Sequence, residues 1–310
     1  MTNLEEATME HVKLKEALAG VSVTNPTPFT KDLSQVDTDG LSRNLRFIAD
    51  EGIGMVVPCG NTGEFYSLSE KEWAEVVRTT VDTIGGRMTV MAGIGHSLTT
   101  AIDMLERAAA QGADGVMVMY PQHVFSSEEG ILHYYQRILD SAGEIGVVLY
   151  KKGPLLSDEV LNKIKDHPRL VGVKYAFGRI VDFARTVQNV GKSITWSCGT
   201  SERFAPFFWL AGAEGFTSGL GNFAPHISLQ MIDGLRNEKY NEVMRLQEMI
   251  SPLEFLREGR GAANNVPVVK AMLDHIGLVG GECRPPIHSL TPAERKSVIK
   301  ATAGWDLKRE

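Results

Sequence analysis

Short apolar runs alternate with helical patterns along most of this 310-residue sequence. The runs predict eight strands, at 20–25, 54–58, 88–93, 114–119, 145–150, 170–175, 193–198 and 214–218. Helical spacing predicts a helix after each strand, at 39–51, 69–84, 98–111, 127–142, 157–166, 180–190, 201–211 and 225–236. Strict alternation of strands and helices implies a parallel sheet. Eight such units fit a closed (β/α)8 TIM barrel of the α/β class, which is the fold we expect.

One connection from helix to strand recurs in three places. The sequence reads EGIGMVVPCG from Glu51, QGADGVMVMYP from Gln111 and AGAEGFTSG from Ala211. In each, a helix ends at a glycine, which accepts the left-handed conformation that turns the chain back toward the sheet. A doubly wound open sheet is the alternative fold. It is weakened because no GxGxxG follows the first strand, which ends TNPTPF.

The strand pattern stops near residue 238. Three further helices are predicted, at Tyr240–Leu256, Val266–Ile276 and Pro292–Ala303. Thr291 and Glu294 form a capping box for the last of them. We therefore expect a barrel with a short N-terminal arm over residues 1–237 and a three-helix appendage over 238–310. No low-complexity linker separates the two, so we expect them to pack together.

Composition narrows the partners and the compartment. A net charge of -6 argues against nucleic acid as the main partner, because a basic stripe is absent. The first 18 residues are charged and polar, so we expect no signal peptide, no membrane partner and a cytoplasmic location. Cys59, Cys198 and Cys283 lie far apart without metal-ligand spacing, and the first two are expected to be small core residues. We predict no metal.

The sixth predicted strand, LVGVKYA at 170–176, contains a lysine near its C-terminal end. Burying an ammonium group is unfavourable, so a lysine inside such a run tends to be a neutral amine, which is a nucleophile. Taken alone, Lys174 fits better as the first solvated residue past the strand. The residues at the other strand ends favour the buried nucleophile, because active sites of barrels lie at the C-terminal ends of the strands.

Two of those strand ends supply suitable partners. The fifth strand ends at Tyr150, one βα unit before Lys174, and a phenol beside an amine can relay protons while the amine attacks a carbonyl. The second strand runs into PCGNTGEFYSLS, whose tight turn offers backbone N–H groups to a carboxylate. Ser69 and Glu72 merely cap the next helix. His123 is either a loop histidine or projects into the same mouth.

The segment GNTGEFYSLS, the terminal Tyr150, the lysine strand VGVKYA and the RPP loop before the last helix together resemble the dihydrodipicolinate synthase and N-acetylneuraminate lyase superfamily. The resemblance spans Gly20 to Ala303. It implies a class I lyase in which Lys174 forms a Schiff base with a 2-keto acid such as pyruvate. Tyr150 would transfer protons, no cofactor would be needed, and the protein would be a homotetramer, a dimer of dimers.

The same resemblance assigns further residues. It places Thr62 with Lys174 and Tyr150 in the catalytic set. The substrate-binding residues that we predict are Gly60, Asn61, Thr62, Gly63, His123 and Gly219.

The sequence departs from the lysine-biosynthesis enzymes at three points. Asn61 replaces the first threonine of their GTTGE signature, and His123 in YPQHVF replaces their second relay tyrosine. Their arginine for the second substrate's carboxylate is absent from KKGPLL, where Lys151 or Lys152 is the only substitute and lacks the bidentate geometry. The Schiff-base half of the site is therefore supported, and the second-substrate half is not.

Three functions stay open. The family label predicts a dihydrodipicolinate synthase-like lyase. GEFYSL and NFAP at Asn222–Pro225 resemble the 5-dehydro-4-deoxyglucarate dehydratase branch, so a sugar-acid dehydratase or a keto-sugar-acid aldolase is the alternative. From another class, Asn61 and His123 favour a non-catalytic, keto-acid-binding regulatory relative, whereas the intact Lys174 and Tyr150 oppose it.

Overall fold

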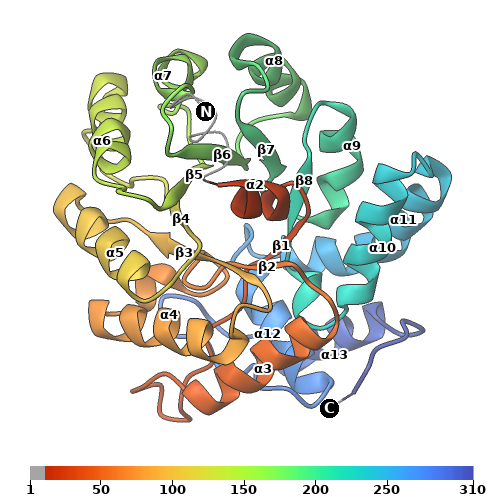
Figure 1. The fold of residues 1–310 in the computed structure, drawn as a ribbon. Coiled ribbons are helices and arrows are strands. Elements are labelled where there is room, and N and C mark those ends of the chain that lie inside the picture. The colour runs from red at the N-terminus through yellow and green to blue at the C-terminus, as the bar shows by residue number, and fades with distance from the viewer. Residues whose placement is uncertain (1–10, 310) are drawn as a thin grey trace. The chain divides into compact units, whose positions relative to one another are not determined.

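The expected barrel is confirmed. The structure, a computed structural model, describes residues 11–309. Its strands follow the chain order around a closed barrel (Figure 1). They are β1 (Val21–Val23), β2 (Met55–Val56), β3 (Thr89–Ile94), β4 (Gly115–Val118), β5 (Gly146–Lys151), β6 (Leu170–Tyr175), β7 (Thr195–Cys198) and β8 (Gly215–Ser218). The strands from β3 to β8 pair in parallel, each with the next.

Helices follow the strands as the alternation predicts. They are α3 (Thr38–Asp50), α4 (Glu70–Ile84), α5 (Leu98–Ala110), α6 (Glu128–Asp140), α7 (Asp158–Ile164), α8 (Ile180–Val190), α9 (Ala205–Leu210) and α10 (Pro225–Arg236). The strands then stop, and α11 (Tyr240–Arg257), α12 (Asn265–His275) and α13 (Pro292–Ala301) complete the chain. The predicted capping boxes of α4 and α13 are both present.

The described chain divides into two compact units, and each unit is made of two segments that are separate in the sequence. Residues 11–22 and 89–217 form the first, and residues 23–88 and 218–309 form the second. The appendage that we predicted at 238–310 thus belongs to a unit that also contains β2, α3 and α4. The split at residue 237 remains a prediction about domains.

In the first unit, a helix that the sequence reading missed packs against the strands. The segment expected to be an arm contains α2 (Val12–Leu18), which contacts β3, β6 and β7 and lies beside β6 and β7 in Figure 1. Leu14 and Leu18 are its buried residues. A Cβ atom at Gly115 would lie 2.5 Å from Leu14 Cδ2, and one at Gly172 would lie 2.6 Å from Leu18 Cδ2. The two glycines therefore make the room that the leucines fill. Residues 1–10, the rest of the expected arm, lie outside the described residues.

Alternating side chains of the same unit face two different surroundings. Tyr175 on β6 packs outward, with ring centroids 4.9 Å from Phe183 of α8 and 6.3 Å from Phe208 of α9. Successive residues of a strand point to opposite faces, so the neighbouring Lys174 points into the barrel. The helices that surround these strands thus supply a large apolar layer on one face, and the lysine lies on the other.

The second unit joins Val23 and β2 to the C-terminal helices. Val57 N–H donates to Val23 O at 2.8 Å, which links β2 to β1. Asn44 of α3 exchanges two hydrogen bonds with the backbone of Val279, which follows α12. These contacts anchor the C-terminal segment to the early part of the chain.

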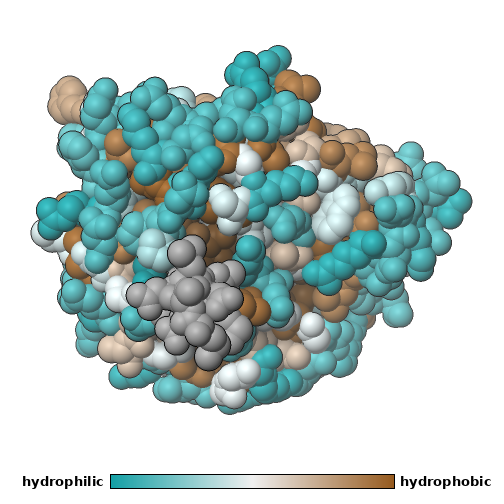
Figure 2. Space-filling view, turned by 45° about the horizontal axis from the view of Figure 1, so that its top comes forward, coloured by the Kyte–Doolittle hydropathy of each residue, from teal (hydrophilic) through white to brown (hydrophobic). Residues whose placement is uncertain are grey.

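The three cysteines are buried free thiols, as expected of core residues for Cys59 and Cys198. Hydrophilic side chains occupy most of the face drawn in Figure 2. Within residues 11–309, no helix combines the length and the apolarity needed to cross a membrane.

Candidate active site

Lys174 and Tyr150 lie side by side at the ends of adjacent strands. They are register partners in the pairing of β5 with β6. The Lys174 Nζ atom lies 4.6 Å from the centroid of the Tyr150 ring. Both side chains are buried, with 6% and 5% of their surface exposed. The predicted pair of amine and phenol is thus assembled by the parallel register itself.

Burial gives Lys174 the properties of a nucleophile. It lowers the pKa of Lys174 to about 7, because the apolar surroundings disfavour the ammonium, and the positive charge of Lys152 lowers this pKa further. An ordinary lysine is almost fully protonated at pH 7. The lowered pKa makes the neutral Lys174 amine accessible near pH 7, and a neutral amine can attack a carbonyl.

Strand β7 and the residue that follows it supply two neighbours of Lys174 that the sequence did not single out. Ser197 is the register partner of Lys174, and its buried Oγ atom has no hydrogen-bond partner among the described residues. A Cβ atom at Gly199 would lie 2.8 Å from Lys174 Cγ, so only glycine leaves the lysine stem its space. The signal in the sequence was the alternation Thr195, Ser197 and Gly199 on one face of the strand.

The structure separates the two lysines after Tyr150. The Nζ atom of Lys151 donates to Leu156 O and lies 5.6 Å from the centroid of the Tyr175 ring, on the outer face of the strands. Lys151 is therefore wrong as a substitute for the missing arginine, because the period of two in a strand turns it away from Tyr150. Lys152 remains the candidate, since its charge acts on Lys174.

His123 lies on the exposed loop after β4. Its ring nitrogen Nδ1 accepts a hydrogen bond from Phe125 N–H at 3.1 Å. The ring is thus engaged within its own loop, and a role in substrate binding remains a prediction. Tyr120, three residues earlier, is a neighbour of this loop that the sequence did not single out. Its hydroxyl accepts a hydrogen bond from Leu155 N–H at 3.2 Å, and its ring fills the space beside Gly153.

The predicted carboxylate-binding turn belongs to the second unit. Its residues Gly60, Thr62 and Gly63 are buried, and Asn61 is half-buried. Among the described residues, the N–H groups of Thr62 and Gly63 donate to no backbone carbonyl. Two adjacent N–H groups without a backbone acceptor suit an anion.

The same turn is tightly packed. A Cβ atom at Gly63 would lie 3.0 Å from Cys59 N and 3.1 Å from Asn25 O, so any side chain at this position would press on the backbone of both segments. The hydroxyl of Thr27 donates to Gly63 O at 2.8 Å. Cys59 and Glu64, which flank the turn, both have positive φ angles, 57° and 58°. Such angles are unfavourable for residues with side chains and persist where the surroundings impose them.

Gly219 follows β8, in the same unit. A Cβ atom there would lie 2.4 Å from the guanidinium of Arg257, which is itself buried and donates to Glu254 Oε1 at 2.6 Å. Asn222 of the NFAP segment donates to Gly219 O at 3.0 Å and to Thr24 O at 3.1 Å. The segment thus holds the strand end in place, which gives its residues a structural role.

No group of three or more metal-ligating side chains is assembled within residues 11–309. The chemistry that the described residues offer is that of an amine nucleophile with a phenol as proton donor and acceptor. A closed barrel with a buried lysine of lowered pKa near a strand end has the chemistry of an enzyme that attacks carbonyl groups.

Comparison with known proteins identifies the family. The model of the Dihydrodipicolinate synthetase family matches residues 17–303. A protein of Bacillus subtilis named "Probable 5-dehydro-4-deoxyglucarate dehydratase" is 30% identical over 282 residues, 89% of this chain and 90% of that protein. A 4-hydroxy-tetrahydrodipicolinate synthase of Methanosphaerula palustris is 29% identical over 93% of this chain and 99% of its own length.

A solved structure agrees with these relatives. Dihydrodipicolinate synthase from Bacillus clausii is 39% identical, with a TM-score of 0.91 over 94% of this chain and 99% of that one. The chain therefore belongs to the dihydrodipicolinate synthetase family, and it is an enzyme, a class I lyase. The non-catalytic regulatory reading is set aside.

Proposed function

We propose that the enzyme joins Lys174 to a 2-keto acid as a protonated imine. The observation that carries this proposal is the buried Lys174, whose pKa is lowered to about 7, beside the phenol of Tyr150. A lysine that was only structural would gain from a counter-ion. Burial is the main cause of the lowered pKa of Lys174, the positive charge of Lys152 lowers this pKa further, and Cys198 acts in the opposite direction.

The chemistry follows from the neutral amine. Lys174 Nζ forms a bond to the keto carbon, the carbonyl oxygen takes up a proton, and the resulting carbinolamine loses water to give the iminium. Tyr150 moves the protons between nitrogen and oxygen. The iminium draws electrons from the neighbouring carbon, so that a proton or a carbon fragment can leave there and an enamine results.

The turn at 60–63 is assigned the carboxylate of the keto acid. The N–H groups of Thr62 and Gly63 support this assignment, because neither has a backbone acceptor within residues 11–309. Thr62 adds a hydroxyl, and Asn61 adds an amide where a second hydroxyl is usual in the lysine-biosynthesis enzymes. The roles of Gly219 and His123 in binding stay predictions.

Dehydration of a keto-deoxy sugar acid is the reaction that we favour over condensation with an aldehyde. The segments GEFYSL and NFAP, which resemble the dehydratase branch, support this choice. Relatives named as probable 5-dehydro-4-deoxyglucarate dehydratases, at 30% and 29% identity, also support this choice. In such a dehydration, the enamine expels a hydroxyl group as water from the next carbon.

Borohydride reduction tests the proposal directly. The protein is incubated with pyruvate or with a keto-deoxy sugar acid, reduced, and analysed by intact mass and peptide mapping. We expect an adduct on Lys174 with either ligand, no adduct in Lys174→Ala, and turnover only with the sugar acid. Turnover of pyruvate with aspartate semialdehyde would favour the synthase instead, and the absence of any adduct on Lys174 would reject the imine.

The family resemblance also supports a homotetramer in the cytoplasm, with a small keto acid as substrate. These remain proposals about assembly and location.

A further inference from the structure

Glu64, the last residue of the GNTGE segment, is turned away from solvent into an ion pair. Its Oε1 atom lies 2.5 Å from the Nζ atom of Lys270 on α12, and the two side chains are 0% and 1% exposed. Two buried charges at this distance depend strongly on one another, because removal of either leaves the other without a counter-ion in an apolar surrounding. The proposed chemistry uses neither residue.

Lys270 is held on its other sides. Its ammonium donates to Glu282 O at 2.8 Å and lies 4.6 Å from the centroid of the Phe29 ring. The lysine is thus enclosed by a carboxylate, a carbonyl and an aromatic face. Its ion pair with Glu64 therefore joins α12 to the turn.

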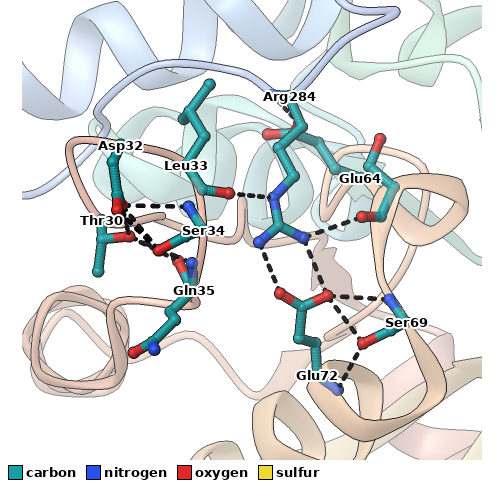
Figure 3. A network of polar contacts seen from close by, with 10 residues as sticks. Thr30, Asp32, Leu33, Ser34, Gln35, Glu64, Ser69, Glu72 and Arg284 are labelled. Atoms are coloured by element: carbon teal, nitrogen blue, oxygen red, sulfur yellow. Dashed lines mark hydrogen bonds and ion pairs between the residues drawn. The ribbon is translucent and has the colours of Figure 1, made fainter.

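Arg284 of the RPP loop makes a second contact with the same carboxylate. Its backbone N–H donates to Glu64 Oε2 at 2.9 Å, so both oxygens of Glu64 have partners from the C-terminal segment. The guanidinium of Arg284 extends past Glu64 to Glu72 and to Leu33 O, as Figure 3 shows. Segments from three parts of the sequence thus meet at this one turn.

These contacts maintain an unusual backbone conformation at Glu64. Glu64 has a left-handed conformation, with φ 58° and ψ 39°, and its N–H closes the turn by donating to Asn61 O at 3.1 Å. This conformation is unfavourable for a residue with a side chain. In it, the backbone bonds of Glu64 and Phe65 are used within the turn, and those of Thr62 and Gly63 are left for a ligand.

We infer that Glu64, through Lys270 and Arg284, is a positioning residue that holds the turn at 60–63 ready to bind the substrate carboxylate. The inference rests on the proposed function, in which that turn is the carboxylate site. It assigns the C-terminal helices a part in catalysis, because α12 supplies the counter-ion that fixes the turn. Preorganised N–H donors bind an anion without having to be reordered at each binding event.

The test uses a double variant, Glu64→Gln with Lys270→Met, in the full-length protein. It removes both buried charges, whereas either single change leaves one charge unpaired and is prone to unfold. The matched control is Asp274→Asn, also on α12, which weakens the ion pair with Arg295 at 2.7 Å and does not touch the turn. Circular dichroism first confirms that each variant is folded.

Two measurements report separately on the order of the turn and on the binding of the keto acid. Hydrogen–deuterium exchange reports on peptides that cover residues 60–68, and borohydride trapping gives the pyruvate concentration for half-maximal adduct formation. In the double variant we expect faster exchange in the turn and a half-maximal concentration raised about tenfold, the loss expected of weakened hydrogen bonds to a charged group. The control should match the wild type in both.

Each outcome bears on the inference. Unchanged exchange at 60–68 in a folded double variant would overturn it, and so would faster exchange with an unchanged half-maximal concentration. If the wild type forms no adduct at all, the proposed function fails, while the exchange measurement still decides whether Glu64 orders the turn.

Discussion

At the scale of single residues, the face of the strand from which a side chain projects decides what surrounds it. Lys174 and Tyr150 were predicted from strand ends one βα unit apart, and the register places them side by side. The sequence offered both Lys151 and Lys152 as substitutes for the missing arginine. Which of the two side chains faces inward is known only when the direction of one residue of the strand is known. Once Tyr150 faces Lys174, the period of two excludes Lys151.

The lowered pKa of Lys174 leads to a pH prediction. The rate of imine formation with pyruvate, measured by borohydride quenching, should rise with pH to a midpoint near 7 and then level off, because the neutral amine attacks. Lys152→Met should move this midpoint upward, since the charge of Lys152 lowers the pKa of Lys174. A midpoint above pH 9 in the wild type would contradict the effect of burial.

Proton transfer by Tyr150 leads to a second prediction at this scale. Tyr150→Phe should lower turnover by roughly 10²-fold or more, because the ring is kept and only the phenol that relays protons is lost. Tyr175→Phe is the control, as this tyrosine lies on the other face of the strands, against Phe183. Equal turnover in both variants would reduce Tyr150 to a packing residue.

At the scale of elements, periodicity found the strands and helices around the barrel but not α2. Its segment, VKLKEAL, is only seven residues long, three of them are charged, and only Leu14 and Leu18 are buried, so the pattern is short and weak. Tertiary packing makes it a helix, because the two leucines fill the space beside Gly115 and Gly172. The predicted helix at 201–211 likewise begins as a 3-10 turn, at Glu202–Phe204, before α9.

The contribution of the packing of α2 to stability can be measured. Leu14→Ala should lower the free energy of unfolding by about 2–5 kcal/mol, the range for a buried leucine truncated in a close-packed site. Val12→Ala on the same helix should change it by less than about 0.5 kcal/mol, because Val12 is 42% exposed. Urea denaturation monitored by circular dichroism compares the two, and equal losses would mean that α2 does not depend on Leu14.

At the scale of the whole molecule, the resemblance predicts a tetramer, and one surface feature fits an assembled state. Val124 and Phe125, on the loop after β4, are 89% and 88% exposed. Two adjacent apolar side chains with this exposure are unfavourable in water, and association would bury them.

Size measurement tests the assembly. Light scattering should give a mass about four times the 34.0 kDa of one chain. Phe125→Asp should lower that mass, because a carboxylate would have to be desolvated in the interface. A wild-type mass of 34.0 kDa would exclude the tetramer.

The sequence by itself determined the barrel and the reactive lysine strand, because periodicity and strand ends are local patterns that survive without knowledge of distant contacts. Only the tertiary structure decided which side of each strand faces inward, that α2 is a helix, and that Glu64 pairs with Lys270. These features depend on residues far apart in the chain, and burial and charge pairing take effect only once folding brings such residues together.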